Sequence, residues 1–442
     1  MNHRDRVALR PMLGLGTVAF FILAFTAGNR AYCAEIASAS ANDFLNSLGI
    51  NTHIDQGVSG GSYIEPLRFL GIRNIRDGGR NSLQTRLVSR ETGVRLDLIC
   101  GGDLEAAITT GKNLASAGAL MAFEGPNEPN NFPITYNGEK GGGSESWAPV
   151  ARFQAALYAA VKSDPQLRQF PVFAVSEGGA ETDNVGLQFL EIPAGAQTTF
   201  PPGTKYADFA NPHNYVSSTR SIYVNNQAWN AADPVLRGPW DGLSVEYGLT
   251  WRHGYKGYEN DQLAALPRVT TETGWDSVDG FGGERTQGTV LVNTYLAQFK
   301  RGWHYTFIYQ LRDGEGSPGN QGVFNANSSP KLAARYIHNL TTILADKAPV
   351  SLPNSLSYSI ADQPATVHDL LLQKSTGAFE LVIWDENAGG NSDQIRVGLG
   401  RNFKTVNIYD VTTGTKPIVV LNDVASVPLT LNDHALIVEL TN

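Results

Sequence analysis

Short β-prone runs recur along the chain, and several are separated by segments whose apolar residues follow helical spacing. Eight such runs can be distinguished: 49–55, 72–77, 93–100, 119–132, 171–176, 206–215, 268–271 and 305–311. Helical patterns occupy residues 43–49, 62–71, 104–117, 147–163, 287–301 and 331–346. Strands that alternate with helices form parallel sheets, so this order predicts an α/β fold, namely a (β/α)8 TIM barrel. An open α/β sandwich with a parallel sheet is the alternative.

The pattern changes from Pro349 onward, where closely spaced strand-like segments follow one another without helices. Turn signals such as Ser375-Thr376-Gly377 separate these segments. Such spacing predicts a small antiparallel β-sandwich that packs on the barrel and stabilises it. Carbohydrate binding by this part is the alternative. The expected domains are therefore a barrel over residues 40–346 and a β-sandwich over residues 347–442.

The N-terminal segment has the pattern of a secretory signal. Met1–Arg10 carries three arginines, and the eighteen residues of Pro11–Gly28 contain no charge. Small residues follow at alternating positions, so cleavage is expected after Cys33 or after Ala39. We therefore expect residues 1–33 to be a signal peptide, the protein to be secreted or periplasmic, and no stable membrane insertion after cleavage. An uncleaved membrane anchor is the alternative, since the apolar run is close to the minimum length of a span.

Composition excludes several classes of function. A formal net charge of −8 gives no electrostatic reason to bind nucleic acid. Cys100 is the only cysteine after the predicted signal, which excludes an internal disulfide and a cysteine-based metal site, and we expect it to be a buried small hydrophobe. The histidine spacing offers no zinc site, and no phosphate-binding glycine motif is present. We expect no cofactor and no metal.

Polar and charged residues stand where the predicted strands end. They are Arg76, Asn127, Glu128, Glu177, His213, Tyr215, Glu272 and Gln310. A barrel carries its active groups at the carboxyl ends of its strands, and an unpaired carboxylate is costly to bury. Glu128 and Glu272, at the ends of two distant strands, therefore predict acid/base and nucleophilic work on a glycosidic bond.

The motifs around these two glutamates resemble clan A of the retaining glycoside hydrolases. Asn127-Glu128-Pro129 follows the fourth strand and Glu272 lies in TETGW after the seventh, and the NEPN form resembles family 39 and related exopolysaccharide glycosidases. The resemblance implies a barrel with a β-sandwich, Glu128 as acid/base and Glu272 as nucleophile. It also implies that Asn127 binds the sugar 2-hydroxyl.

Other positions carry further implications of the resemblance. His213 and Tyr215 are similar to the H-x-Y after the sixth strand of clan A enzymes, where the tyrosine hydrogen-bonds the nucleophile. Arg76 resembles the arginine that holds that carboxylate, and a salt bridge to Asp77 or Glu124 is the alternative.

Several residues keep two interpretations at this point. Glu124 is either a competing acid or the partner of an arginine, and His213 and Asn127 could be structural. Glu177 either contacts sugar hydroxyls or supports the site. Trp275 is a candidate stacking platform for a sugar ring, as are Trp147, Trp240, Trp251 and Trp303. The long segment 180–261 is expected to shape the subsites.

Together these observations predict an exported retaining β-glycoside hydrolase that cleaves a polysaccharide or oligosaccharide by double displacement. A carbohydrate substrate is the expected partner, no nucleic acid is expected, and the oligomeric state is left open. A non-catalytic glycan-binding or matrix protein on the same fold is one alternative, and a transglycosylase is another.

Overall fold

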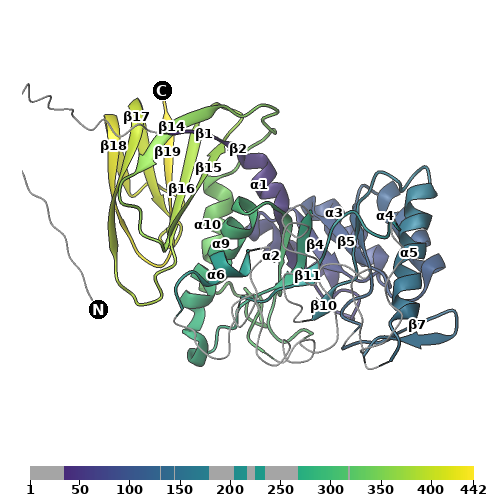
Figure 1. The fold of residues 1–442 in the computed structure, drawn as a ribbon. Helices are drawn as coiled ribbons and strands as arrows, with labels where there is room; N and C mark the ends of the chain where they lie inside the picture. Colours follow the sequence, from purple (N-terminus) through teal and green to yellow (C-terminus); the bar gives the residue numbers. More distant parts are fainter. Residues whose placement is uncertain are drawn as a thin grey trace, which may run out of the picture. The chain divides into compact units, whose positions relative to one another are not determined.

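The structure is a computed structural model that describes residues 34–129, 131–143, 145–178, 204–216, 224–233, 267–316 and 319–442. Residues 33–442 form one compact unit. Within it, the described part of the chain contains a parallel barrel sheet surrounded by helices and an antiparallel C-terminal sheet (Figure 1).

Seven parallel strands form most of the barrel sheet. In spatial order they are β12 (Arg268–Thr273), β13 (Trp303–Ile308), β3 (Leu48–Asn51), β4 (Asn74–Asp77), β5 (Arg95–Ile99), β6 (Leu120–Glu124) and β9 (Val172–Phe173). Parallel bridges from Phe173 to Phe209 and from Ala210 to Arg268 close the ring through an eighth position. All eight positions coincide with the predicted runs, so the prediction of a (β/α)8 barrel is confirmed.

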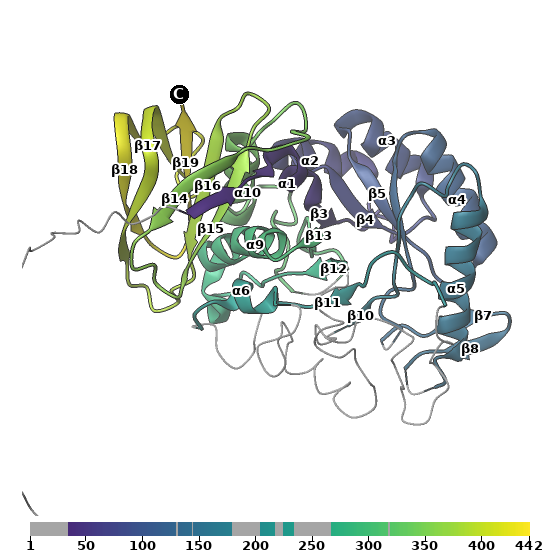
Figure 2. The ribbon, with the colours of Figure 1, turned by 45° about the horizontal axis from the view of Figure 1, so that its top comes forward.

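Helices follow most of the strands and lie outside the ring (Figure 2). They are α1 (Ala41–Ser47), α2 (Ile64–Leu70), α3 (Ser82–Thr92), α4 (Leu104–Ser116), α5 (Ala148–Ser163), α6 (Gln227–Ala231), α9 (Gly283–Lys300) and α10 (Leu332–Ile343), with 3-10 turns η1 (Gly60–Tyr63) and η3 (Asp279–Phe281). Helix α3 was not among the expected helices. Only Thr85 and Val88 are buried on it, so its sequence carries almost no apolar stripe.

Four short strands of the described chain lie within the loops that follow the barrel strands. β7 (Ile134–Tyr136) and β8 (Glu139–Gly141) form a hairpin between β6 and α5. β10 (Glu177–Gly178) and β11 (Pro212–His213) pair in parallel, which aligns the segments that follow the fifth and sixth barrel positions. This pairing places His213 beside the ends of the neighbouring strands.

The C-terminal sheet has eight strands, two of them from the start of the described chain. β1 (Ala34–Ala37), β2 (Ala39–Ser40), β14 (Ser355–Ile360), β15 (Val367–Gln373), β16 (Phe379–Asp385), β17 (Asp393–Asp410), β18 (Val419–Leu431) and β19 (Ala435–Thr441) make it up. β1 pairs with β14 and β2 pairs with β15. Residues 34–40 therefore belong largely to this sheet, a role for which the sequence analysis made no prediction.

Two long strands let this sheet fold over its own core. The first part of β17 pairs with β14, its second part pairs with β19, and the register shifts between Gly398 and Phe403. A cluster that includes Leu381, Ile383 and Val427 is buried between the two layers. This arrangement is the predicted β-sandwich.

The outer face of the sandwich packs on the barrel helices. Val382 and Trp384 alternate with Leu381 and Ile383 along β16, and they belong to the same buried cluster as Val292 of α9 and Leu340 of α10. The Asn339 side-chain amide donates to the carbonyl of Val411 at 2.8 Å across the same contact. Packing of the sandwich on the barrel, which the sequence predicts, is thus confirmed. None of the described helices is both long and apolar enough to cross a membrane.

Gly111 of α4 tests how tightly the helices fit the strand that leads to Glu128. A Cβ at this glycine would lie 2.2 Å from the ring of Phe123 on β6. Replacing a helical glycine by alanine ordinarily gains roughly 0.5–1 kcal/mol. Overpacking a core costs about 1–3 kcal/mol. We therefore expect Gly111→Ala to lower the free energy of unfolding, measured by urea denaturation. Thr109→Ala on the exposed face of the same helix is the control, and a stabilised Gly111→Ala would contradict the packing.

Candidate active site

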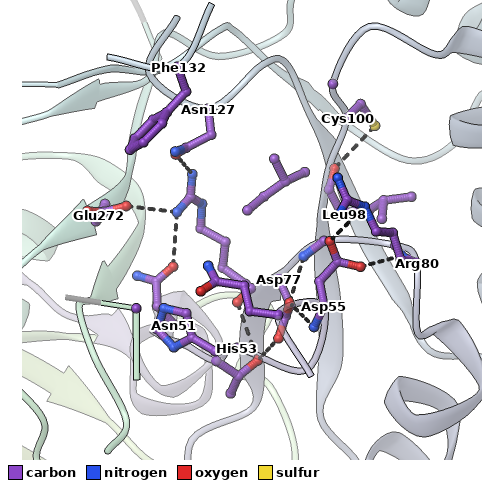
Figure 3. A pocket seen from close by; sticks show the side chains of 18 of the residues that line it. Asn51, His53, Asp55, Asp77, Arg80, Leu98, Cys100, Asn127, Phe132 and Glu272 are labelled. Carbon is purple, nitrogen blue, oxygen red and sulfur yellow. Dashed lines mark hydrogen bonds and ion pairs between the residues drawn. The ribbon is translucent and has the colours of Figure 1, made fainter. Parts of the chain in front are cut away.

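A cavity of about 970 Å³ opens at the carboxyl ends of the barrel strands (Figure 3). Its lining comes from the ends of β3, β4, β5, β6 and β12 and from the loops that follow them. Arg76, Asn127, Glu128, Tyr215 and Glu272 all contribute to it. Five of the residues singled out from the sequence are therefore brought to one cavity, although almost two hundred residues separate the first from the last.

Glu128 is held by a tight turn after β6. Gly125 begins this turn, and a Cβ there would lie 2.8 Å from the backbone nitrogen of Val175, so the close approach requires glycine. Glu128 itself adopts a positive φ of 41°, and its backbone N–H donates to the hydroxyl of Ser176 at 3.3 Å. Strain of this kind persists where the surroundings fix the backbone, and here it directs the Glu128 side chain.

Both oxygens of the Glu128 carboxylate have partners. Oε1 lies 2.7 Å from Nδ1 of His213, and Oε2 accepts a hydrogen bond from the side-chain amide of Asn131 at 3.0 Å. Glu128 is 8% exposed, but it still lines the cavity. It is therefore a nearly buried carboxyl group that can be reached from the cavity.

Glu272 lies on β12, on the opposite side of the barrel opening. Its Oε1 accepts from the hydroxyl of Tyr215 at 2.5 Å, and its Oε2 accepts from Nη1 of Arg76 at 3.0 Å. Burial, followed by the charges of Glu272 and Glu128, raises the pKa of Tyr215 well above its usual value. The phenol therefore keeps its proton, and its O–H donates a hydrogen bond to the Glu272 carboxylate.

The two glutamates approach one another closely. Ligating atoms of Glu128, His213 and Glu272 all lie within 4.8 Å of one another. A separation of roughly 5–5.5 Å between two carboxyl groups is typical of retaining glycosidases, whereas inverting enzymes need about 6.5–9.5 Å. The same three groups could hold a metal ion, but a cation would compete there with Arg76 for Glu272.

Arg76 connects the interior of the barrel to the cavity. Its Nε and Nη2 donate to the two oxygens of Glu124 at 2.7 and 2.8 Å, while Nη1 donates to Asn51 and Glu272. Nη2 also donates to the side-chain oxygen of Asn127 at 2.6 Å. Arg76 therefore forms salt bridges with Glu124 and with Glu272 at the same time.

Glu124 serves as the partner of Arg76. It is 0% exposed, and both its oxygens are bound to the guanidinium. Burial raises the pKa of Glu124, but the charge and hydrogen bonds of Arg76 outweigh it and leave the pKa below its usual value. The alternative that Glu124 is the catalytic acid is therefore wrong, because this carboxylate does not line the cavity and both its oxygens accept from Arg76.

Asp97 adds a third carboxyl group beneath Arg76. It is the β5 residue in register with Arg76, it is 0% exposed, and neither of its oxygens accepts a hydrogen bond from a described residue. Burial, and then the charge of Glu124, raise the pKa of Asp97 well above its usual value. The hydrogen bonds of Arg76 to carboxylates go to Glu124 and Glu272.

The hydrogen bonds around His213 fix where its protons lie. The side-chain oxygen of Asn211 accepts from the backbone N–H of Thr271 at 3.1 Å and from the Thr271 hydroxyl at 3.0 Å. Since that hydroxyl has donated its only proton, it accepts from Nε2 of His213 at 3.0 Å. Nε2 thus carries hydrogen, and Nδ1 of His213 faces Oε1 of Glu128 at 2.7 Å.

The contact with His213 acts on the pKa of Glu128. Burial raises the pKa of Glu128, but the hydrogen bond and charge of His213 outweigh burial, so the pKa lies below its usual value. Glu128 also lines the cavity, so its carboxyl group lies where it could exchange a proton with a bound molecule.

Trp275 does not take part in the site in the way expected, and the prediction for Glu177 cannot be followed in the described residues. Trp275 is 0% exposed, and its indole Nε1 donates to the carbonyl of Phe281 at 3.0 Å, so the prediction that it stacks on a sugar is wrong. It follows β12 at a point where the chain turns back toward η3. The backbone of Glu177 lies in β10, but its side chain is outside the described residues.

The remaining tryptophan and loop predictions have mixed outcomes. Trp147 and Trp303 are buried at 0% and 3% exposure and are core residues. Trp240, Trp251 and most of the segment 180–261 lie outside the described residues. Cys100 is buried and free, as expected.

Phe132 is a cavity residue that the sequence analysis missed as a site residue. It is 60% exposed, lines the cavity, and its backbone N–H donates to the carbonyl of Glu128 at 2.7 Å (Figure 3). An exposed aromatic ring at a polar cavity is a feature of sugar-binding sites, since the C–H faces of sugars pack on aromatic rings. The sequence feature that could have identified Phe132 is its place four residues after Glu128, in NEPNNF.

Comparison with solved structures supports the fold. The chain is similar to a family 39 glycoside hydrolase from Bacteroides cellulosilyticus WH2, with a TM-score of 0.57 and 14% identity over 90% of this chain and 82% of that one. It is also similar to the catalytic domain of GH30 xylanase C from Talaromyces cellulolyticus (TM-score 0.55, 11% identity, 93% of this chain and 99% of that one). A GH51 arabinofuranosidase from Xanthomonas axonopodis pv. citri gives a TM-score of 0.52 at 10% identity, over 93% of this chain and 98% of that one.

These neighbours are clan A glycoside hydrolases, the clan that the sequence motifs resemble. No protein-family model and no curated protein matches the chain. At such low identities the likeness establishes a shared fold, while the roles of individual residues rest on their own geometry.

Arg76 provides a test of the site's electrostatics. Arg76→Met leaves Glu124 buried without its partner, so we expect a loss of about 3–5 kcal/mol in the free energy of unfolding, measured by urea denaturation. Adding Glu124→Gln to that variant should recover part of the loss, because the unpaired charge is then removed. Arg80→Met is the matched control, since the Arg80 side chain is 87% exposed. Equal effects of Arg76→Met and Arg80→Met would contradict the buried network.

Proposed function

We propose that this protein is an exported retaining β-glycoside hydrolase that cleaves a polysaccharide or oligosaccharide. The observation that carries the proposal is the approach of Glu128 and Glu272 to within 4.8 Å across the barrel opening. Each glutamate also has a different environment, since one contacts His213 and the other accepts from Tyr215 and Arg76. A proton donor and an ionised carboxylate at this spacing are what double displacement needs.

In the first step, an oxygen of Glu272 attacks the anomeric carbon, and the bond from that carbon to the leaving sugar oxygen breaks. Glu128 transfers its proton to that oxygen, so the leaving sugar departs as a neutral alcohol. The product is a glycosyl ester on Glu272. Tyr215 and Arg76 favour the carboxylate before attack and stabilise it again as it leaves.

In the second step, water attacks the anomeric carbon while Glu128 takes a proton from it, and the ester bond to Glu272 breaks. His213 hydrogen-bonds Glu128, which loses its proton to the leaving oxygen in the first step and regains one from water in the second. Asn127 is positioned by Arg76, and its amide nitrogen remains to bind a sugar hydroxyl. No step requires a cofactor.

The cavity's size supports a substrate of more than one sugar. Its volume of about 970 Å³ lies at the upper end of the range of roughly 300–1,000 Å³ found for small-molecule pockets. It extends from Glu272 to Arg80 and Asp103, which follow β4 and β5. We therefore propose an oligomeric or polymeric glycan, with sugars bound on both sides of the cleaved bond.

Export is part of the proposal and rests on the N-terminal sequence. Ala34–Ala37 forms β1 and pairs residue for residue with β14. Cleavage after Cys33 would leave this strand intact, whereas cleavage after Ala39 would remove it. Between the two sites considered from the sequence, we therefore propose the first.

The direct test is release of reducing ends from a panel of β-linked plant and bacterial polysaccharides. We expect activity from the wild type and none from Glu272→Gln, because an amide cannot form the glycosyl ester. Glu128→Gln should lose roughly 10²–10⁴ in kcat/KM on natural glycans and far less on aryl glycosides, whose leaving groups need no proton. Equal release by the wild type and Glu272→Gln would overturn the assignment.

The alternatives give other results in the same assay. A transglycosylase would lose activity in both variants but yield longer glycans when an acceptor sugar is present. A non-catalytic glycan-binding protein would bind a glycan from the panel without releasing reducing ends.

Phe132 provides a second test, directed at substrate binding. Phe132→Ala removes an exposed stacking surface, so we expect KM for an oligosaccharide to rise by up to about tenfold while kcat changes little. Phe132→Tyr should behave like the wild type, because the ring is retained. If Phe132→Ala leaves KM unchanged on every glycan that the protein cleaves, the ring does not contact substrate.

A further inference from the structure

A second cavity, of about 770 Å³, adjoins the candidate active site. Gly101 and Asp103, in the loop after β5, line both cavities. From this shared rim the second cavity follows the start of α4 and reaches Ala160 on α5, and the β7–β8 hairpin contributes the other wall. The two helices and the hairpin lie side by side in both ribbon views (Figures 1 and 2). We call this second cavity the outer groove.

The loop between β6 and α5 contributes to both cavities. It places Glu128 and Phe132 in the candidate active site, and shortly afterwards it places Tyr136 and Asn137 in the outer groove. A long ligand that follows this loop away from Glu128 therefore passes the exposed ring of Phe132 and then the ring of Tyr136. The outer groove is thus connected to the candidate active site by the chain segment that carries the proposed acid.

Packing holds the walls of the outer groove in place. The residues Asn137-Gly138 have φ values of 51° and 80°, as in the tight two-residue turn of a β-hairpin. The ring of Tyr136 packs edge-on against Phe153, with 5.4 Å between the ring centroids. A Cβ at Gly102 would lie 2.6 Å from the carbonyl oxygen of Thr135, so the loop after β5 packs directly on the hairpin. A ligand therefore meets walls that are already ordered, which lowers the entropic cost of binding.

The lining of the outer groove suits an uncharged sugar polymer. The exposed side chains of Glu105, Thr135 and Asn137 offer carboxylate, hydroxyl and amide groups to sugar hydroxyls. The half-buried ring of Tyr136 offers an apolar surface to the C–H face of a sugar. Among the described residues that line the groove, the charged ones are Asp103 and Glu105, both acidic. Repulsion by these carboxylates disfavours nucleic acids and acidic polysaccharides.

We propose that the outer groove binds further sugars of the glycan chain that Glu128 and Glu272 cleave. This inference rests on the proposed hydrolase function, and it narrows the substrate to an uncharged polysaccharide or long oligosaccharide that reaches both cavities. Sugars in the groove lie away from the bond that breaks, so their binding energy positions the long chain and raises kcat/KM for long substrates only. A short oligosaccharide that occupies the candidate active site alone gains nothing from the groove.

The test compares kcat/KM on the cleaved polysaccharide with kcat/KM on the shortest oligosaccharide that the wild type cleaves. Ala160→Trp places an indole ring in the groove, so we expect kcat/KM on the polysaccharide to fall about tenfold while kcat/KM on the short substrate is unchanged. Ala159→Trp is the matched control, because Ala159 is an exposed neighbour on α5 that does not line the groove. This control should behave like the wild type on both substrates.

Asn137→Gly is a second, milder variant that preserves the hairpin. Glycine adopts the positive φ of this position readily, so the turn is kept while the amide group is removed from the groove. We expect kcat/KM on the polysaccharide to fall about threefold, with no change on the short substrate. A loss confined to the long substrate does not arise from misfolding, because a misfolded enzyme loses activity on both.

A binding measurement separates this inference from the hydrolase function. Native gels that contain xylan, β-1,3-glucan or β-mannan retard a protein that binds the glycan, and Glu272→Gln is used so that no glycan is consumed. Adding Ala160→Trp to Glu272→Gln should reduce the retardation, whereas adding Ala159→Trp should not. Alginate, an acidic β-linked polysaccharide, should retard none of these variants.

The possible results distinguish the two proposals. Equal kcat/KM of the wild type and Ala160→Trp on the polysaccharide would overturn the role of the groove and leave the hydrolase function intact. Equal losses on the long and short substrates in both Ala160→Trp and Asn137→Gly would also overturn it. Retardation that Ala160→Trp reduces, without hydrolysis by the wild type, would refute the hydrolase and retain glycan binding by the groove. Neither hydrolysis nor retardation would overturn both proposals.

Discussion

The guanidinium of Arg76 is the interaction on which the candidate site depends. It lies at the end of β4, binds both oxygens of the buried Glu124, and extends a further N–H to Glu272 at the cavity. A buried ion pair is stable only when its hydrogen bonds are complete, and here Asn51 and Asn127 complete them. The barrel interior thus fixes the position of a charge that acts at its opening. Asp97 lies beneath the same guanidinium, and burial together with the charge of Glu124 raises its pKa well above its usual value.

The two glutamates differ because strands on different sides of the barrel place different partners around them. Glu272 accepts hydrogen bonds from a phenol and from a guanidinium. Glu128 meets an imidazole, whose near nitrogen lies 2.7 Å from its Oε1 and whose far nitrogen donates to Thr271. Two carboxyl groups of the same type therefore have different surroundings, which is what the proposed separation of an acid from a nucleophile requires.

Much of the fold and site follows from the sequence because one rule connects them. Polar residues at strand ends can meet only if the strands are parallel and close into a ring, which is why Arg76, Glu128, Tyr215 and Glu272 could be selected before their geometry was known. The rule predicts which residues lie at the end of a strand. It does not predict where the side chains of the following loop residues point. Trp275 illustrates this limit, since three residues past Glu272 the chain has turned and the indole is in the core.

Other features depend on contacts between distant segments, which no local pattern reveals. Strand β1 becomes visible only through its pairing with β14, more than three hundred residues later. Helix α3 lacks an apolar stripe because little of its surface is buried. Phe132 looked like an ordinary loop residue until the cavity showed its exposed ring beside Glu128.

The most direct test of the account is the stereochemistry of cleavage, followed by proton NMR with a β-linked glycan that the protein hydrolyses. Because oxygens of Glu128 and Glu272 lie within 4.8 Å, the account predicts that the first sugar released has the β configuration and converts to the α form only afterwards by mutarotation. Initial release of the α anomer would show that water attacks the anomeric carbon directly. That result would contradict a glycosyl ester on Glu272 and the mechanism built on it.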